Sequence, residues 1–109
     1  MAKFITFFSY SAEAVKAMIH HPSDRSAAAT ALVESLGGTL EAFYWMQGGH
    51  DGFLITELPD STSGAALAAA VASTGAISGL SSHEIFDHDQ QAAIVAGAKT
   101  ALEAYIPPN

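Results

Sequence analysis

The chain contains no cysteine among its 109 residues. Disulfide bonds, thiolate metal sites and thiol nucleophiles are therefore excluded. Basic residues are also scarce, with four lysines and arginines against eleven aspartates and glutamates and a formal net charge of −7. Nucleic-acid phosphates and anionic membrane surfaces attract proteins through lysine and arginine, so we expect neither as a partner.

Long apolar runs are missing as well. No stretch approaches the ~20 apolar residues of a membrane-spanning helix. The opening residues, MAKFITFF, lack the apolar core and the cleavage site of a signal peptide. We therefore expect a cytoplasmic protein. Hydrophobic residues still make up 50% of the chain, which suffices for a core, and the length fits a single domain over residues 1–109.

Apolar periodicity and turn residues predict an alternating order of strands and helices. The expected strands are residues 3–10, 39–47, 52–58 and 81–86, and the expected helices are residues 12–36, 61–73 and 89–105. Pro22 interrupts the first helix, which either kinks or divides into two helices, the second capped by Ser23 or Asp24. The order βαββαβ with an extra C-terminal helix predicts an α+β ferredoxin-like sandwich.

Residues 36–60, LGGTLEAFYWMQGGHDGFLITELPD, resemble the GYD-domain family of the dimeric α/β-barrel group. The resemblance is carried by Gly37-Gly38, residues 40–45, the turn Gly48-x-x-Asp51 and residues 58–60, together with the similar helix start at residues 23–25. His50 stands where the family has the tyrosine of its name motif. The resemblance implies a ferredoxin-like fold and assembly as a dimeric α/β barrel, and it implies no particular reaction.

Both faces of the expected sheet are apolar. The third strand has Phe53 and Ile55 on one face and Leu54 and Leu58 on the other, and the second has Leu40, Tyr44 and Met46 opposite Phe43 and Trp45. Because helices cover one face only, something must cover the second. We expect another copy of the chain to do so. The alternatives are that the terminal helix folds back across this face or reaches over a partner subunit.

The polar chemistry is concentrated in the glycine-rich turn at His50 and Asp51, which are our candidate catalytic residues. His50 could act as a general base or a metal ligand, and Asp51 could orient an imidazole or bind a cation. The alternatives are an idle, exposed His50 and a structural Asp51, a preferred turn residue whose carboxylate accepts backbone N–H bonds.

The candidate substrate-binding residues are Arg25, Tyr10, Tyr44, Trp45, His20 and His21. Arg25 could hold a carboxylate or phosphate through its guanidinium fork, or could simply pair with a surface acid. The aromatic side chains could line a ligand cavity, although aromatics at strand spacing are more often core. We expect Trp45 to be at least half buried. We also expect His50 and Asp51 to approach Arg25, in the same chain or in a partner.

No cofactor can be named from the sequence. The five histidines could assemble a metal or haem site, yet their spacing matches no zinc motif, and GxSxG and P-loop patterns are absent. The sequence predicts a small soluble homo-oligomer with an aromatic-lined pocket that binds or converts a small molecule. The alternative is a non-catalytic structural or stress-related oligomer.

Overall fold

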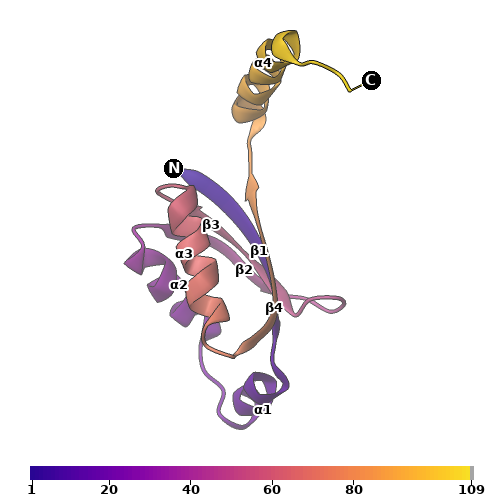
Figure 1. The fold of residues 1–109 in the computed structure, drawn as a ribbon. Coiled ribbons are helices and arrows are strands. Elements are labelled where there is room, and N and C mark those ends of the chain that lie inside the picture. Colours follow the sequence, from indigo (N-terminus) through magenta and orange to yellow (C-terminus); the bar gives the residue numbers. More distant parts are fainter. Residues whose placement is uncertain (109) are drawn as a thin grey trace.

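Strands and helices alternate along residues 1–108, the part of the chain that the structure, a computed structural model, describes. The elements are β1 (Ala2–Tyr10), α1 (Ala12–His20), α2 (Arg25–Ser35), β2 (Thr39–Trp45), β3 (Gly52–Leu58), α3 (Ser61–Ala72), β4 (Ile77–Ile85) and α4 (His88–Ala104). The strands form one antiparallel sheet in the order β2-β3-β1-β4. Helices α2 and α3 lie on one side of it (Figure 1). This arrangement confirms the α+β ferredoxin-like fold.

The interrupted first helix is divided into α1 and α2. Helix α1 begins after Ser11, whose hydroxyl accepts a 3.1 Å hydrogen bond from the N–H of Ala14. Helix α2 begins after Asp24, whose carboxylate accepts a 3.1 Å hydrogen bond from the N–H of Ala27. Pro22 disfavours helical geometry at the residue before it, so the chain leaves α1 and restarts with a new cap.

The core lies between the sheet and the two helices that cover it. It is formed by Ala2, Phe4, Val33, Leu58 and Leu67. Helix α3 approaches β1 closely at Gly64, where a Cβ atom would lie 2.5 Å from Cζ of Phe4. A side chain at this position would collide with the buried ring, so glycine sets the distance between α3 and the sheet.

A bulge in β2 changes one predicted face. Tyr44 lies opposite Phe53, but the register shifts between Leu40 and Ala42, and Leu40 lies opposite the buried Thr56. Leu40 therefore shares the helix-covered face with Phe43, and the prediction that it shares a face with Tyr44 is wrong. The extra residue of a bulge reverses the simple alternation that the prediction assumed.

The other face of the sheet carries apolar side chains that the helices of residues 1–108 leave uncovered. We call it the open face and define it by Ile5, Phe7, Tyr44, Phe53 and Ile55. The ring centroids of Phe7 and Phe53 lie 6.0 Å apart, and those of Tyr44 and Phe53 lie 5.5 Å apart. Tyr44 is 59% exposed. The open face confirms that both sides of the sheet are apolar.

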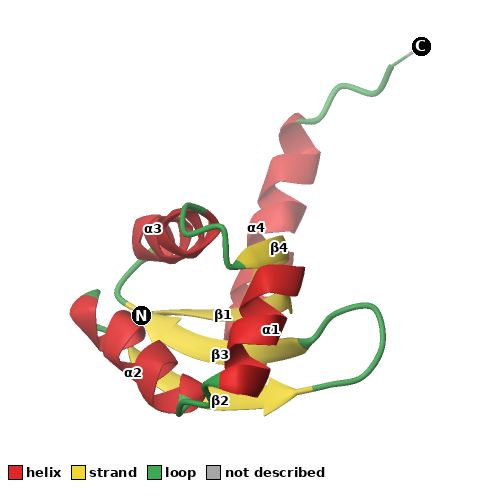
Figure 2. Cartoon of the chain, turned by 90° about the horizontal axis from the view of Figure 1, so that it is seen from below, coloured by secondary structure: helices red, strands yellow, loops and turns green. Residues whose placement is uncertain are grey.

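Helix α4 projects beyond the end of the sheet (Figures 1 and 2). It begins with a capping box, in which the side chains of Asp87 and Gln90 each accept a hydrogen bond from the other residue's backbone N–H. All of its residues are exposed. The radius of gyration is 17.4 Å, against about 13 Å for a compact chain of this length. The terminal helix therefore does not fold back across the open face in this structure.

Strand β4 begins at Ile77, four residues before the expected start at Ser81, and Ile77 pairs with Tyr10. Among residues 1–108, no helix is both long and apolar enough to cross a membrane.

Candidate functional site

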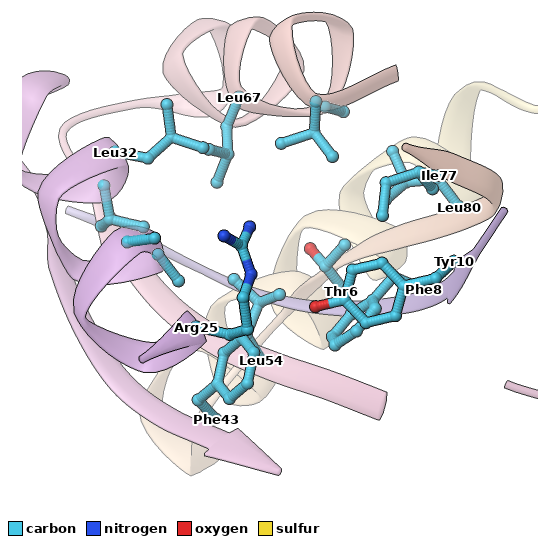
Figure 3. Close-up of a pocket in the computed structure, with 15 residues that line it drawn as sticks. Thr6, Phe8, Tyr10, Arg25, Leu32, Phe43, Leu54, Leu67, Ile77 and Leu80 are labelled. Carbon is cyan, nitrogen blue, oxygen red and sulfur yellow. The ribbon is translucent and has the colours of Figure 1, made fainter. Parts of the chain in front are cut away.

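A cavity of ≈ 120 Å³ lies between the helix-covered face of the sheet and helices α2 and α3 (Figure 3). We call it the inner cavity. The sheet contributes Thr6, Phe8, Tyr10, Phe43, Leu54, Ile77 and Leu80, and the helices contribute Arg25, Ala28, Ala29, Leu32, Val33, Leu67, Ala68 and Val71. Nearly all of these side chains are apolar, so the walls of the cavity are complementary to an apolar group.

The cavity exists because the helices present small side chains to the sheet. Ala28 and Ala29 of α2 and Ala68 of α3 line it. An interior is normally packed without such voids, and larger side chains at these positions would occupy the space. Apart from Arg25, the helix residues that line the inner cavity are not identified from the sequence, because alanine-rich helices carry no motif. The signal that could have found them is the coincidence of two alanine-rich helices with one aromatic sheet face.

Three side chains bring polar groups to the inner cavity. The hydroxyl of Thr6 lies 2.9 Å from the hydroxyl of Ser82 and is thereby engaged. Tyr10 contributes a phenol, and the guanidinium of Arg25 points into the space between the helices and the sheet (Figure 3). Within the described part of the chain, the only ion pair joins Lys3 to Glu41. Among the described residues, Arg25 therefore does not form the ion pair with a surface acid that was its alternative role.

A second, shallower pocket adjoins the inner cavity. It has a volume of ≈ 400 Å³ and is lined by Met18, Pro22, Ser23, Asp24, Arg25, Ser26, Phe43 and Trp45. We call it the outer pocket. Because Arg25 and Phe43 line both spaces, the two pockets meet at these side chains. Pro22, Ser23 and Asp24, which lie between α1 and α2, form one wall of the outer pocket.

Trp45 is more exposed than predicted. Its side chain is 55% exposed, although we expected it to be at least half buried. The physical reason is its position at the end of the edge strand β2, where neighbouring structure covers it on one side only. Its ring lies 5.3 Å from that of Tyr10. The side chain of Trp45 thus lines the outer pocket and contacts Tyr10, which lines the inner cavity.

Asp51 has a structural role in the hairpin turn. Its carboxylate accepts a 2.8 Å hydrogen bond from the N–H of Tyr10, and its own N–H donates to the carbonyl of Phe8 over 2.8 Å. This is the alternative that the sequence analysis gave for Asp51. The turn is therefore fastened to the end of β1, beside the residues that line the inner cavity.

His50 lies on the side of the open face. Its Nδ1 atom is 3.3 Å from the hydroxyl of Ser9, and its ring centroid is 5.7 Å from that of Phe7. Side chains alternate along β1, so Phe7 and Ser9 point away from the face that Arg25 approaches. Within one chain the structure does not bring His50 and Arg25 together. The predicted approach across a partner subunit stays a prediction.

The remaining candidates are dispersed. Tyr44 lies on the open face, stacked on Phe53. His20 and His21 are exposed at the end of α1 and line neither pocket. In residues 1–108, no three histidine, aspartate or glutamate side chains gather where they could hold a metal ion. Of the six candidate binding residues, the two pockets bring together Arg25, Tyr10 and Trp45.

Comparisons with known proteins place the chain in a family. Solved structures with a similar fold include MtbAldR, with a TM-score of 0.54, 13% identity and coverage of 80% of this chain and 53% of that chain. A mutant of MhuD with two manganese protoporphyrin IX groups bound per active site gives a TM-score of 0.45 and 20% identity, covering 81% of this chain and 95% of that chain. This chain thus spans about half the length of MtbAldR. No curated protein matches it. Residues 4–95 match the GYD domain, and the chain therefore belongs to the GYD-domain family.

Proposed function

We propose that this GYD-domain protein is a homo-oligomer that binds a small molecule in the inner cavity. The observation that carries the proposal is the guanidinium of Arg25 in a cavity whose walls are otherwise almost entirely apolar (Figure 3). Small-molecule sites commonly combine apolar walls with a few convergent polar groups that orient the ligand. Arg25 and Tyr10 supply such groups here.

The size of the cavity limits the ligand. An apolar cavity of about 150 Å³ binds benzene, so the inner cavity of ≈ 120 Å³ suits a body no larger than one ring. A longer ligand would continue past Arg25 and Phe43 into the outer pocket. We therefore expect a small molecule rather than a peptide or a nucleotide.

The open face supports the oligomeric part of the proposal. Ile5, Phe7, Phe53 and Ile55 are only partly buried, and Tyr44 is exposed. Contiguous apolar surface of this kind marks an interaction site, and sheet-on-sheet packing with a second copy would bury it. Helix α4 adds the exposed side chains of Ile94 and Leu102, which a partner subunit would also cover.

The alternative function is that of a non-catalytic structural oligomer. The specific observation in its favour is that the apolar surface of the open face and of α4 lies outside the inner cavity. In that case the chain would assemble, and the cavity would remain without a ligand. A binding test therefore separates the two functions, whereas a test of assembly alone does not.

Catalysis by His50 and Asp51 is a separate proposal. It is supported by the 3.3 Å distance between Nδ1 of His50 and the hydroxyl of Ser9, because a histidine near a hydroxyl can accept its proton. For the ligand of the inner cavity, this chemistry would require the hairpin turn of a second copy. If conversion of a ligand is found, His50→Gln should abolish turnover and leave the affinity unchanged.

Filling the inner cavity tests the binding proposal. Ala68→Phe places a ring in the cavity, and Ala69→Phe places the same ring on an exposed position of the same helix. A panel of single-ring acids, amides and alcohols is titrated while the fluorescence of Trp45 is recorded, since the chain has one tryptophan. We expect binding to be lost in Ala68→Phe and kept in Ala69→Phe, and melting curves verify folding. Equal binding to both variants would contradict the proposal.

Light scattering coupled to size exclusion tests assembly. We expect at least twice the 11.3 kDa mass of one chain. Ile55→Glu, which places a charge on the open face, should give the monomer because an unpaired charge cannot be buried there. Ile19→Glu on the exposed side of α1 serves as the matched control and should leave the mass unchanged. A wild-type protein that elutes as a monomer at micromolar concentration would contradict the oligomer.

A further inference from the structure

We infer that the ligand of the inner cavity is a small monocarboxylate whose carboxylate is bound by the guanidinium of Arg25. The inference rests on the proposed function and adds the chemical class of the ligand. Three features of the described residues carry it, namely the unpaired cation, the acid beside it and the apolar walls beyond it.

The cation is free to take an anion. Arg25 has no carboxylate partner within residues 1–108, where Lys3 is held by Glu41 at 3.0 Å. The other basic residues, Lys16 and Lys99, lie in α1 and α4 and line neither pocket. Arg25 is exposed, so its guanidinium is open to a ligand that enters from solvent. A ligand carboxylate could form two parallel hydrogen bonds with its fork.

The neighbouring acid limits the charge of the ligand. Asp24 precedes Arg25 and lines the outer pocket. Its carboxylate accepts a 3.1 Å hydrogen bond from the N–H of Ala27, and this bond, with that of Ser26, holds the pKa of Asp24 below its ordinary value. Asp24 is therefore charged at neutral pH. A second negative charge on the ligand would add repulsion from Asp24 with no second cation in either pocket to offset it, which disfavours a phosphate dianion.

The walls beyond Arg25 determine the rest of the ligand. Val71, Ile77 and Leu80 line the inner cavity on the side of α3 and β4 (Figure 3). The hydroxyl of Thr6 is already engaged by Ser82 at 2.9 Å. Beyond the carboxylate, the phenol of Tyr10 is the one polar side-chain group left among the described walls of the inner cavity, and burying further polar groups of the ligand unpaired would be costly. The ligand body is therefore apolar, as in a phenyl ring or a short branched alkyl chain.

Matched acids and amides test the inference. Phenylacetate and phenylacetamide have nearly the same shape and differ in charge, as do 3-methylbutanoate and its amide. Each is titrated at constant ionic strength against the wild type, Arg25→Gln, Arg25→Lys and Lys16→Gln. The control Lys16→Gln removes the same charge from an exposed position of α1 that lines neither pocket. Melting curves show whether each variant folds. Arg25→Lys keeps the positive charge at this position, and Arg25→Gln removes it.

The wild type and Lys16→Gln should bind each acid at least about tenfold more tightly than its amide, because a charge-assisted contact is lost with the amide. In Arg25→Gln the ratio of acid to amide affinity should fall to about one. In Arg25→Lys it should lie between that value and the wild-type ratio. If the wild type binds acid and amide equally, and Ala68→Phe abolishes both, the inference is overturned and the proposed function stands. If the acid preference persists in Arg25→Gln, the inference is also overturned. If the wild type binds none of the four probes, both the inference and the proposed function fail.

Discussion

The carboxylate of Asp51 accepts a 2.8 Å hydrogen bond from the backbone N–H of Tyr10, whose side chain lines the inner cavity. The contact joins the glycine-rich turn between β2 and β3 to the end of β1, at the point where the register between β1 and β4 shifts. A carboxylate that orders backbone in this way is a positioning group. The turn that looked catalytic from its sequence is therefore fastened to a strand that lines the inner cavity.

Asp51→Ala should destabilise the fold by about 1–3 kcal/mol, because the partly buried N–H of Tyr10 loses its acceptor. Asp51→Asn keeps an acceptor oxygen and should lose much less. Urea unfolding followed by circular dichroism measures both changes. Equal stability of Asp51→Ala and the wild type would show that the contact does not position the turn.

Gly64→Ala should destabilise the protein by roughly 1–3 kcal/mol, since the new methyl group would lie 2.5 Å from the ring of Phe4. The matched control is Gly97→Ala in α4, where no atom lies within 4 Å of the added Cβ. That substitution should raise helix content without loss of stability. A tolerated Gly64→Ala would mean that α3 is not closely packed on β1.

The N-terminal cap of α3, formed by Asp60, should make the stability of the fold depend on pH. The N–H and hydroxyl of Ser63 both donate to Asp60 at 2.8 Å and hold the pKa of Asp60 below its ordinary value of 3.8. The stabilisation is therefore present above that ordinary value and is lost as the pH falls below it through the folded-state pKa. Asp60→Asn keeps a capping oxygen and cannot titrate.

As the pH is lowered from about 5 to about 3, the midpoint of unfolding should fall less steeply for Asp60→Asn than for the wild type. Glu103→Gln in the projecting helix α4 is the control, and it should follow the wild type. The account of this cap would be wrong if Asp60→Asn followed the same acid dependence as the wild type.

Phe8 and Trp45 should differ in their contributions to stability. Phe8 is 3% exposed and Trp45 is 55% exposed. Phe8→Ala should cost about 3–5 kcal/mol as a core truncation, whereas Trp45→Ala should cost about 1–2 kcal/mol, mainly from its contact with Tyr10. Chemical unfolding compares them. A larger cost for Trp45→Ala would place that ring in the core rather than at the edge.

Most of the fold could be predicted from the sequence because its signals are local. Pro22, with the cap candidates Ser23 and Asp24, marked the start of α2, and the alternation of Phe53, Leu54 and Ile55 marked the two faces of β3. The bulge near Leu40 and the early start of β4 at Ile77 were missed. Both depend on strand pairing, which no local pattern records.

The candidate site could be predicted only in part. Arg25, Tyr10 and Trp45 were chosen for their chemistry, and the structure brings them to adjoining pockets. Within one chain the structure places His50 beside Ser9 and Phe7, on the face of the sheet away from Arg25, because proximity along the sheet end does not decide which face a side chain occupies. The approach of His50 to Arg25 across a partner subunit stays a prediction. The cavity itself depends on small side chains of α2 and α3 facing the same space, a property of tertiary packing.

The central claim is that the inner cavity is the ligand site, and methyl NMR tests it most directly. Phenylacetate is titrated into protein with labelled leucine and valine methyl groups. The signals of Leu67, Val71 and Leu80, which line the cavity, should shift with one saturable curve, while those of Val95 and Leu102 in α4 should stay in place. Saturable shifts confined to α4 or the open face, or no shift at millimolar phenylacetate, would contradict the claim.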